Sequence, residues 1–175
     1  MRYGSIEYRY AAPFADALVE DSAFRSWVLG RTKFAASAQN ARLMNEEMRR
    51  QRSSATWWRS HFTEKCRCQG CSGQETDLLA VFETGTDRFA LHVEIKQPSD
   101  KFSTKRPQAI NYGLRAKCWV ASAPASVLTH SDAATILLCS GSKLAEYALH
   151  AGEFETVMTF EEISAAFPCL AFPAP

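Results

Sequence analysis

Glu94 and Lys96 stand two residues apart near the end of a segment that has the alternation of a β-strand. In residues 88–96 (RFALHVEIK), every second position from Phe89 to Ile95 is apolar, and Glu94 and Lys96 occupy intervening positions. Because successive side chains of a strand point to opposite faces, this acid and this amine are expected to project together from one face of a sheet. Taken alone, the spacing is more typical of an exposed ion pair, which contributes little to stability.

A second acid, Asp77, begins the preceding strand-like segment, residues 77–83 (DLLAVFE), and the letters GTD between the two segments indicate a turn. If the hairpin closes with an even-numbered loop, Asp77 lies opposite Glu94 or Lys96 on the same side of the sheet; an odd-numbered loop breaks this alignment. Two converging carboxylates repel each other, and a divalent cation such as Mg²⁺ is the usual means of keeping both ionised. A neighbouring lysine can orient an attacking water, help to deprotonate it, and stabilise charge on a phosphate. The three residues together predict a metal-dependent site that hydrolyses phosphodiester bonds.

The order of Asp77, a hairpin and then the tripeptide EIK at residues 94–96 resembles the PD-(D/E)XK motif of restriction-endonuclease-like nucleases, although Thr76 stands where the motif has proline. The resemblance implies that Asp77 and Glu94 are ligands of Mg²⁺ or Mn²⁺ and that the Ile95 carbonyl completes the protein ligands. It implies that Lys96 is the catalytic lysine. It also implies a core built from a helix, a β-meander, a second helix and a further strand.

Exonuclease-type members of this superfamily carry a Gln-x-x-x-Tyr element on the helix after the lysine, and Gln108 and Tyr112 match that spacing. Side chains four residues apart lie on one face of a helix. By the resemblance, Gln108 is a catalytic residue that positions the active-site groups or the substrate, and Tyr112 flanks the bound substrate. Some members add an acid from the first core helix; Glu46 and Glu47 are both available here, and helical phase does not choose between them.

Three basic residues follow the motif lysine, where the phosphate backbone of a nucleic acid would pass. They are Lys101, Lys105 and Arg106. A loop whose charges are simply solvated explains them equally well. The first explanation predicts that these residues bind DNA.

The cluster Cys66-x-Cys68-x-x-Cys71, preceded by His61, contains the residue types that bind structural zinc. These four residues are a candidate Zn²⁺ site, because three thiols within six residues are close enough to share one metal. The alternative, which the sequence favours, is a loop of free thiols, since the cysteines of a cytoplasmic protein are normally kept reduced.

The composition is that of a soluble globular protein. The chain has 175 residues, 46% hydrophobic and 22% charged, which suits one domain spanning residues 1–175. No apolar run approaches the roughly 20 residues that cross a bilayer, and the first residues, MRYGSIEYRY, lack the order of a signal peptide. A cytoplasmic protein without a membrane partner is therefore expected. The net charge of +1 neither requires nor excludes a nucleic-acid partner.

Periodicity and turn residues predict an α/β fold, with a central mixed sheet flanked by helices and a helical N-terminal region. A helix over 31–52 is expected from the helical spacing of Phe34, Ala38, Ala41, Met44 and Met48. The predicted helices are 13–28, 31–52, 105–115, 142–152 and 161–167, and the predicted strands are 77–83, 88–96, 118–122, 134–140 and 155–160. This order matches the restriction-endonuclease-like core that the resemblance implies.

The function expected from these residues is hydrolysis of phosphodiester bonds in DNA by a Mg²⁺- or Mn²⁺-dependent deoxyribonuclease. A phage or bacterial source is expected, because small single-domain members of the superfamily occur there. With no separate recognition domain, such a chain is expected to recognise DNA structure, or to act as a homodimer or with a protein partner. The alternative is a non-catalytic nucleic-acid-binding or protein-interaction module that retains the nuclease fold.

Overall fold

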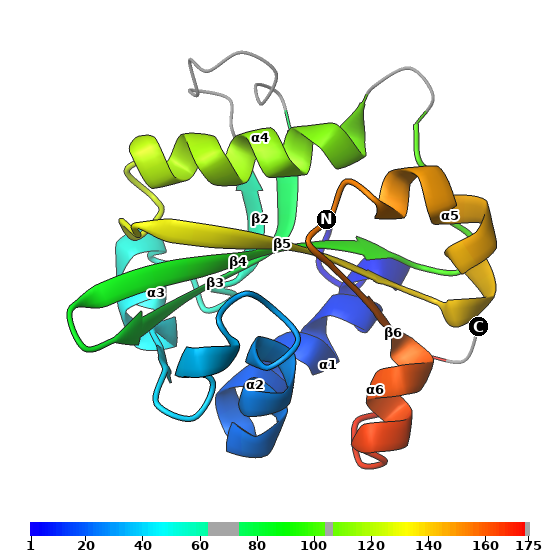
Figure 1. Cartoon of the computed structure of the whole chain (residues 1–175), viewed down its shortest axis with the longest axis horizontal. Helices are drawn as coiled ribbons and strands as arrows, with labels where there is room; N and C mark the ends of the chain where they lie inside the picture. The colour runs from blue at the N-terminus through cyan, green and yellow to red at the C-terminus, as the bar shows by residue number, and fades with distance from the viewer. Residues whose placement is uncertain (63–73, 104–106, 174–175) are drawn as a thin grey trace.

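The computed structural model describes residues 1–62, 74–103 and 107–173, and over these ranges the chain forms an α/β fold (Figure 1). The described strands form a 6-stranded mixed sheet. In Figure 1, α4 and α5 cover one face of this sheet, and α1, α2 and α6 lie against the other. The helices and strands, in chain order, are α1 (Ile6–Glu20), α2 (Ser22–Leu29), β1 (Arg42–Leu43), α3 (Asn45–Arg52), β2 (Arg59–Phe62), β3 (Glu75–Thr84), β4 (Asp87–Lys96), α4 (Gln108–Ala121), β5 (Asp132–Cys139), α5 (Leu144–Ala151), β6 (Thr156–Thr159) and α6 (Phe160–Ala166).

The sheet combines an antiparallel part with a parallel part. Its order is β1-β3-β4-β5-β6, and β2 also pairs with β3. Both β1 and β2 run antiparallel to β3, as does β4, whereas β4, β5 and β6 run parallel to one another. Parallel neighbours need a crossover connection, and α4 supplies it between β4 and β5. The C-terminal ends of β4, β5 and β6 therefore meet at one edge of the sheet.

The β3–β4 hairpin confirms the even-numbered loop on which the site prediction depended. Thr84 pairs with Asp87, which leaves a two-residue turn of Gly85 and Thr86. Gly85 has φ of 59°, a left-handed conformation that such turns require and that glycine adopts without strain. The register continues to Leu78 opposite Val93, so Asp77 comes next in line with Glu94.

The predicted helix over 31–52 is wrong in its first two thirds. Ala35–Ser37 form only a 3-10 turn, and the chain then pairs with β3: Arg42 and Leu43 form β1, and the Met44 amide donates to the Val81 carbonyl at 2.9 Å. Only Asn45–Arg52 is α-helical. The helical spacing of the apolar residues reflects burial in a common core; Phe34, for example, stacks on Phe89 with ring centroids 4.0 Å apart.

Three other elements differ from the expectation. The strand predicted over 118–122 is wrong: residues 118–121 are the last turn of α4, because a short apolar run does not distinguish a strand from a buried helical turn. The first helix begins at Ile6, where the Ser5 side chain accepts from the Tyr8 amide, and it ends before Asp21, which caps α2. A 3-10 turn, Gly141–Lys143, precedes α5, so Ser142 is not its N-cap.

Candidate active site

The site prediction centred on Asp77, and the structure places this residue where the β3–β4 ladder stops. The last paired residues are Leu78 and Val93. One residue beyond, Asp77 Oδ2 accepts from the Ile95 amide at 2.9 Å, and the Asp77 amide donates to the Tyr112 hydroxyl at 3.1 Å. A side-chain hydrogen bond thus replaces a backbone bond of the ladder, and it fixes the carboxyl between β4 and α4.

Glu94, Lys96 and Gln108 form a closed triangle of hydrogen bonds beside Asp77. Lys96 Nζ lies 2.6 Å from Glu94 Oε1 and donates to Gln108 Oε1 at 3.1 Å. Gln108 Nε2 donates to the same Glu94 Oε1 at 2.7 Å. The structure therefore brings together the four residues predicted to be catalytic.

Burial of this triangle excludes the exposed ion pair that the spacing alone favoured. The side chains of Lys96 and Glu94 are 9% and 1% exposed. Removing two charges from water costs several kcal/mol, so a buried ion pair is a poor way to stabilise a fold. The pair is therefore a candidate functional site.

The electrostatics of the cluster favour a bound cation. Burial raises the pKa of Asp77 well above its usual range, and the neighbouring Glu94 and Glu7 carboxylates raise it further. Burial alone would lower the pKa of Lys96, but Glu94 and Asp77 more than offset this and raise it. Glu94 Oε2 is buried and has no hydrogen-bond partner among the described residues. The protein thus concentrates negative charge and an unpaired carboxylate oxygen at one point.

The oxygen donors of this cluster fit a hard cation. Within residues 1–62, 74–103 and 107–173, no group of three or more His, Cys, Asp and Glu side chains is arranged to hold a metal ion. Mg²⁺, however, is commonly bound through only one or two carboxylates and keeps several waters. Asp77 and Glu94 would hold it, with the Ile95 carbonyl as the third protein ligand implied by the motif.

Tyr112 connects α4 to the ends of β3 and β4 at the site. It is fully buried, its hydroxyl donates to the Val93 carbonyl at 3.4 Å, and the Arg115 guanidinium lies 4.2 Å from its ring centroid. Its hydroxyl thus joins the ends of β3 and β4, since it also accepts from the Asp77 amide. This geometry favours a positioning role over the substrate contact that was predicted.

Glu7 is a further acid that acts on Asp77, and the sequence did not single it out. It lies in the first turn of α1, is half-buried, and is close enough to Asp77 to raise the pKa of that residue. Burial raises the pKa of Glu7 itself. The N-terminal amine of Met1 lowers this pKa, but Glu75 and Glu94 raise it further. Ser5 could have indicated this helix start, because serine is a good N-cap. It places the start of α1 seven residues before the predicted one.

Glu46 and Glu47, the two acids of the predicted helix over 31–52, lie elsewhere. Both are on α3, where Glu46 pairs with Arg49 and Glu47 with Arg42. Arg42 also binds Glu83, which is six residues along β3 from Asp77, or roughly 20 Å at the rise of a strand. Among the acids of the N-terminal helices, Glu7 on α1 is the one that raises the pKa of Asp77.

The other predicted residues are only partly described. Lys101 is exposed in the loop after β4, and Lys105 and Arg106 lie outside the described residues, as do Cys66, Cys68 and Cys71. His61 is buried, and its Nε2 lies 3.1 Å from the Trp57 carbonyl oxygen. The zinc-site prediction therefore stays a prediction.

Comparison with models of known protein families, with curated proteins and with solved structures finds no match for this chain. Among the described residues, no helix has the length and apolarity needed to cross a bilayer. The site must therefore be interpreted from its own geometry.

Glu7→Gln is expected to weaken Mg²⁺ binding without removing it. The substitution keeps the shape of the side chain and removes one of the negative charges around Asp77. Because Glu7 is half-exposed, the loss is expected to be roughly two- to fivefold in apparent affinity, less than about 1 kcal/mol. A Mg²⁺ titration followed by thermal unfolding measures it. Glu46→Gln on α3 is the matched control, and equal affinities for the two variants would remove Glu7 from the site.

Proposed function

We propose that this protein is a Mg²⁺- or Mn²⁺-dependent nuclease that hydrolyses phosphodiester bonds in DNA. The observation that carries the proposal is the buried cluster of Asp77, Glu94 and Lys96, joined by Gln108, with Glu94 Oε2 unpaired among the described residues. A site with two acids, one amine and a raised pKa at Asp77 has the chemistry that metal-assisted phosphodiester hydrolysis needs.

The arrangement of elements supports the same proposal. Antiparallel β2, β3 and β4 are followed by α4 and by β5 parallel to β4, with α1 preceding them. This is the order of elements that the resemblance to the PD-(D/E)XK nucleases implies. The acids lie at the ends of β3 and β4, and Gln108 lies in the first turn of α4, which are the positions that the motif assigns to them.

In metal-assisted hydrolysis at this site, Lys96 acts as a cation. Because its pKa is raised, it stays protonated near neutral pH and is suited to donate a hydrogen bond to a phosphate oxygen or to an attacking water. Glu94 and Gln108 hold the ammonium in place, and Tyr112 holds the Asp77 backbone. A divalent cation bound by Asp77 and Glu94 would supply Lewis acidity, lowering the pKa of a water and stabilising charge on the phosphate.

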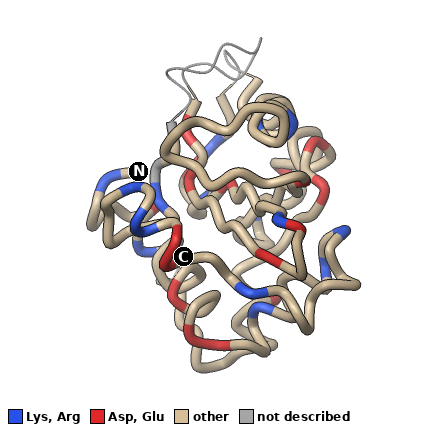
Figure 2. Tube along the Cα trace, turned by 90° about the vertical axis from the view of Figure 1, so that its left-hand side faces the viewer, with Lys and Arg blue, Asp and Glu red and all other residues tan. Residues whose placement is uncertain are grey.

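Bulk electrostatics do not single out a DNA-binding face. Lys and Arg positions and Asp and Glu positions are interspersed along the described chain (Figure 2), in keeping with the net charge of +1. DNA would therefore be held by local contacts around the site, among which Lys101 is an exposed candidate. Weak, structure-dependent binding of DNA fits this arrangement better than strong sequence-specific binding.

A nicking assay tests the proposal. Purified protein is expected to convert supercoiled plasmid to nicked or linear forms, or to degrade single-stranded DNA, with Mg²⁺ or Mn²⁺ and not with EDTA. Lys96→Met, which keeps the length of the side chain and removes the charge, is expected to lower the rate by about 10²- to 10³-fold, the cost of losing one charge-stabilising donor.

Lys33→Met is the matched control, because Lys33 forms an exposed pair with Asp132. Wild-type protein that cuts no form of DNA with any divalent metal would overturn the nuclease proposal. The chain would then be better explained as a non-catalytic binding module.

A further inference from the structure

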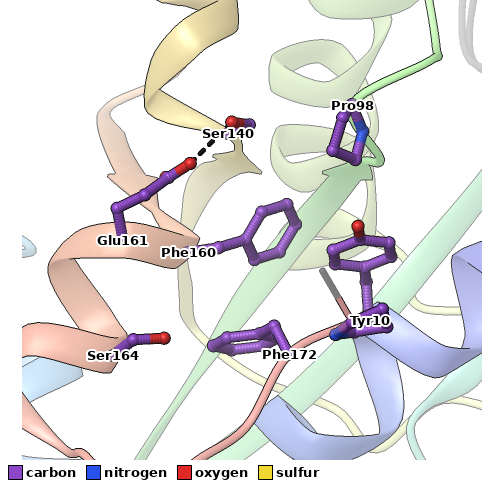
Figure 3. A pocket seen from close by; sticks show the side chains of 8 residues that line it. Tyr10, Pro98, Ser140, Phe160, Glu161, Ser164 and Phe172 are labelled. Carbon is purple, nitrogen blue, oxygen red and sulfur yellow. Dashed lines mark hydrogen bonds between the residues drawn. The ribbon is translucent and has the colours of Figure 1, made fainter. Parts of the chain in front are cut away.

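Two groups of aromatic rings lie on opposite faces of the sheet, near the C-terminal ends of β4 and β5. On the face covered by α1 and α6, the rings of Tyr10, Phe160 and Phe172 line a pocket of about 210 Å³ (Figure 3). The polar groups of this pocket are bonded to each other, because Ser140 Oγ donates to Glu161 Oε1 at 2.6 Å. The sheet separates this pocket from the candidate active site, which lies on the α4 face.

The second group of rings lies on the α4 and α5 face and contacts the candidate active site. Its members are Phe102, Tyr147, His150 and Phe154. Phe102 lies in the loop after β4, and Lys96 Nζ lies over its ring, 4.9 Å from the ring centroid. This distance is within the roughly 6 Å at which the negative face of an aromatic ring attracts a cation. The ring therefore contacts the ammonium group that would stabilise charge on a phosphate.

The Phe102 ring adds a third contact to the two hydrogen-bonding partners of the Lys96 ammonium. Glu94 Oε1 lies 2.6 Å from Nζ, and Gln108 Oε1 accepts from Nζ at 3.1 Å. An ammonium has three N–H donors, so the two acceptors that the described residues supply leave one donor for a substrate oxygen or a water. The ring attracts the cation as a whole and offers no oxygen acceptor, so it restrains the ammonium and keeps this donor available.

Packing against α5 fixes the position of the Phe102 ring. The ring stacks on His150 with centroids 4.4 Å apart and meets Tyr147 edge to face with centroids 5.1 Å apart. The Tyr147 hydroxyl also donates to the Asp100 carbonyl, which ties the backbone of the loop to the same helix. The place of the ring is therefore set by α5 and the loop, independently of Lys96.

Burial strengthens the contact between the ring and the ammonium. Phe102 is 7% exposed, and the Lys96 side chain is 9% exposed. A cation over an aromatic ring is held more strongly when it is desolvated than at an exposed site, because less water competes for it. A lysine ammonium stands on a flexible four-carbon stem, so without the ring it would occupy more positions beside Glu94.

We propose that Phe102 is a positioning residue for Lys96, whose ring face holds the ammonium where its remaining N–H donor is available to the substrate. The inference rests on the proposed nuclease function and adds to it a residue that does not itself touch the substrate. It also gives α5 a role in catalysis, because α5 fixes the ring that restrains the lysine.

Fluorination of Phe102 tests the ring face and leaves the shape of the side chain almost unchanged. Phenylalanine with one, two or three ring fluorines is introduced at position 102, and each fluorine withdraws negative charge from the face. With Mg²⁺, kcat for DNA cleavage is expected to fall stepwise to about 5- to 30-fold below wild type, while KM stays within about twofold. A kcat that does not depend on the number of fluorines would overturn the inference, because packing alone senses the shape of the ring and not its charge.

Phe102→Leu and Phe102→Tyr separate the ring face from apolar packing. Leucine keeps the apolar contact with α5 and is expected to lower kcat by about 5- to 30-fold, whereas tyrosine keeps the ring and is expected to restore most of kcat. Phe154→Leu is the matched control, because Phe154 is also 7% exposed and belongs to the same group of rings, with its centroid 6.4 Å from that of Phe102. Equal losses of kcat in Phe102→Leu and Phe154→Leu would contradict the assignment.

A spectroscopic measurement separates this inference from the proposed function. Protons above an aromatic ring are shifted upfield by its ring current, so the ε-methylene signal of Lys96 is expected upfield of that of the exposed Lys117 in metal-free protein carrying ¹³C-lysine. Lys96→Met identifies the signal. Phe102→Tyr and Phe154→Leu are expected to keep the upfield shift, and Phe102→Leu is expected to lose it.

This signal is informative even for a protein that cuts no DNA. An upfield shift that depends on the Phe102 ring would support the positioning of Lys96 although the nuclease proposal had failed. A Lys96 signal that is the same in wild type and in Phe102→Leu would overturn the inference whatever the activity.

Discussion

Asp77→Asn is expected to abolish metal-dependent cleavage and, at the same time, to raise the melting temperature of the metal-free protein. Asparagine can still accept the Ile95 amide hydrogen bond, so the backbone geometry is retained. It cannot supply an anionic ligand, and the loss of several kcal/mol of transition-state stabilisation lowers the rate by about 10³-fold or more. If Asp77 served only to stabilise the fold, neutralising it would not raise the stability of the protein.

The stability gain is expected to depend on pH with a defined sign. Burial, Glu94 and Glu7 raise the pKa of Asp77 in the folded protein, so the folded state binds this proton more tightly than the unfolded state does. The protonated Asp77 carboxyl therefore stabilises the folded wild-type protein fully below the unfolded pKa of about 4. This contribution is lost as pH rises through the pKa of Asp77 in the folded protein. The advantage of Asp77→Asn over wild type is therefore small near pH 4 and largest above the folded pKa.

Thermal unfolding of both proteins in EDTA at a series of pH values measures this difference. Each 1 kcal/mol is expected to appear as roughly 2–4 °C in melting temperature at this chain length. Added Mg²⁺ should stabilise wild type and not the variant. Asp87→Asn, in an exposed position at the turn of the same hairpin, is the control. A variant that still binds Mg²⁺, or that is less stable than wild type above pH 7, would exclude Asp77 as a metal ligand.

The second large effect is expected in acid, where buried histidines should destabilise the fold. His61, His92 and His130 are all buried, and the rings of His61 and His92 lie against Trp119. The His92 ring centroid lies 5.1 Å from that of Trp119 and 6.1 Å from that of His130. Both ring nitrogens of His92 have no hydrogen-bond partner among the described residues, and Arg115 is the cation that acts on it most strongly. A protonated His92 would therefore have no hydrogen-bond partner in the part of the chain that the structure describes, and Arg115 would repel it.

The sign of the pH dependence of stability follows from the shifts in the three histidine pKa values. Burial and Arg52 lower the pKa of His61 to about 3, burial and Arg115 lower the pKa of His92, and burial lowers the pKa of His130. Below about pH 6.5 the unfolded chain takes up protons that the folded chain does not, so stability falls as pH falls. A histidine that is protonated only in the unfolded state contributes up to about 1.4 kcal/mol per pH unit. Asp77 opposes this, because the raised pKa of its carboxyl acts in the other direction.

Urea unfolding at several pH values between 7.5 and 5 measures this dependence. Wild type is expected to lose stability steeply below pH 6.5, and His92→Leu is expected to reduce the slope by about 1.4 kcal/mol per pH unit. His150→Leu on α5, outside the cluster, is the control and should leave the slope unchanged. A free energy of unfolding that stays constant from pH 7 to pH 5 would show that the three imidazoles accept protons in the folded protein.

Local rules predicted correctly which side chains lie together around Glu94. Strand alternation placed Glu94 and Lys96 on one face, loop parity placed Asp77 beside them, and helical spacing placed Gln108 and Tyr112 on one side of α4. These relations depend on a few neighbouring residues, so a single sequence contains them. Burial of the cluster was not predicted, because it depends on how α4 packs over the sheet.

Contacts between distant segments account for the failures. Glu7 reaches the site only because α1 lies under the sheet, more than sixty residues before Asp77 in the chain, and no spacing rule connects the two. Arg42 and Leu43, just before α3, are extended because their backbone pairs with β3, a partner about forty residues away. Apolar periodicity records which residues are buried and does not say which backbone groups they pair with.

The hydrogen bond between the Ile95 amide and the Asp77 carboxyl gives the site a built-in spectroscopic reporter. Most amides of a central strand donate to another backbone, and their exchange with solvent reports opening of the sheet. The Ile95 amide donates to an ionisable side chain instead, so its chemical shift and exchange rate should follow the protonation and ligand state of that carboxyl. One backbone resonance in β4 would then register events at the site in the intact protein, without any label or substrate.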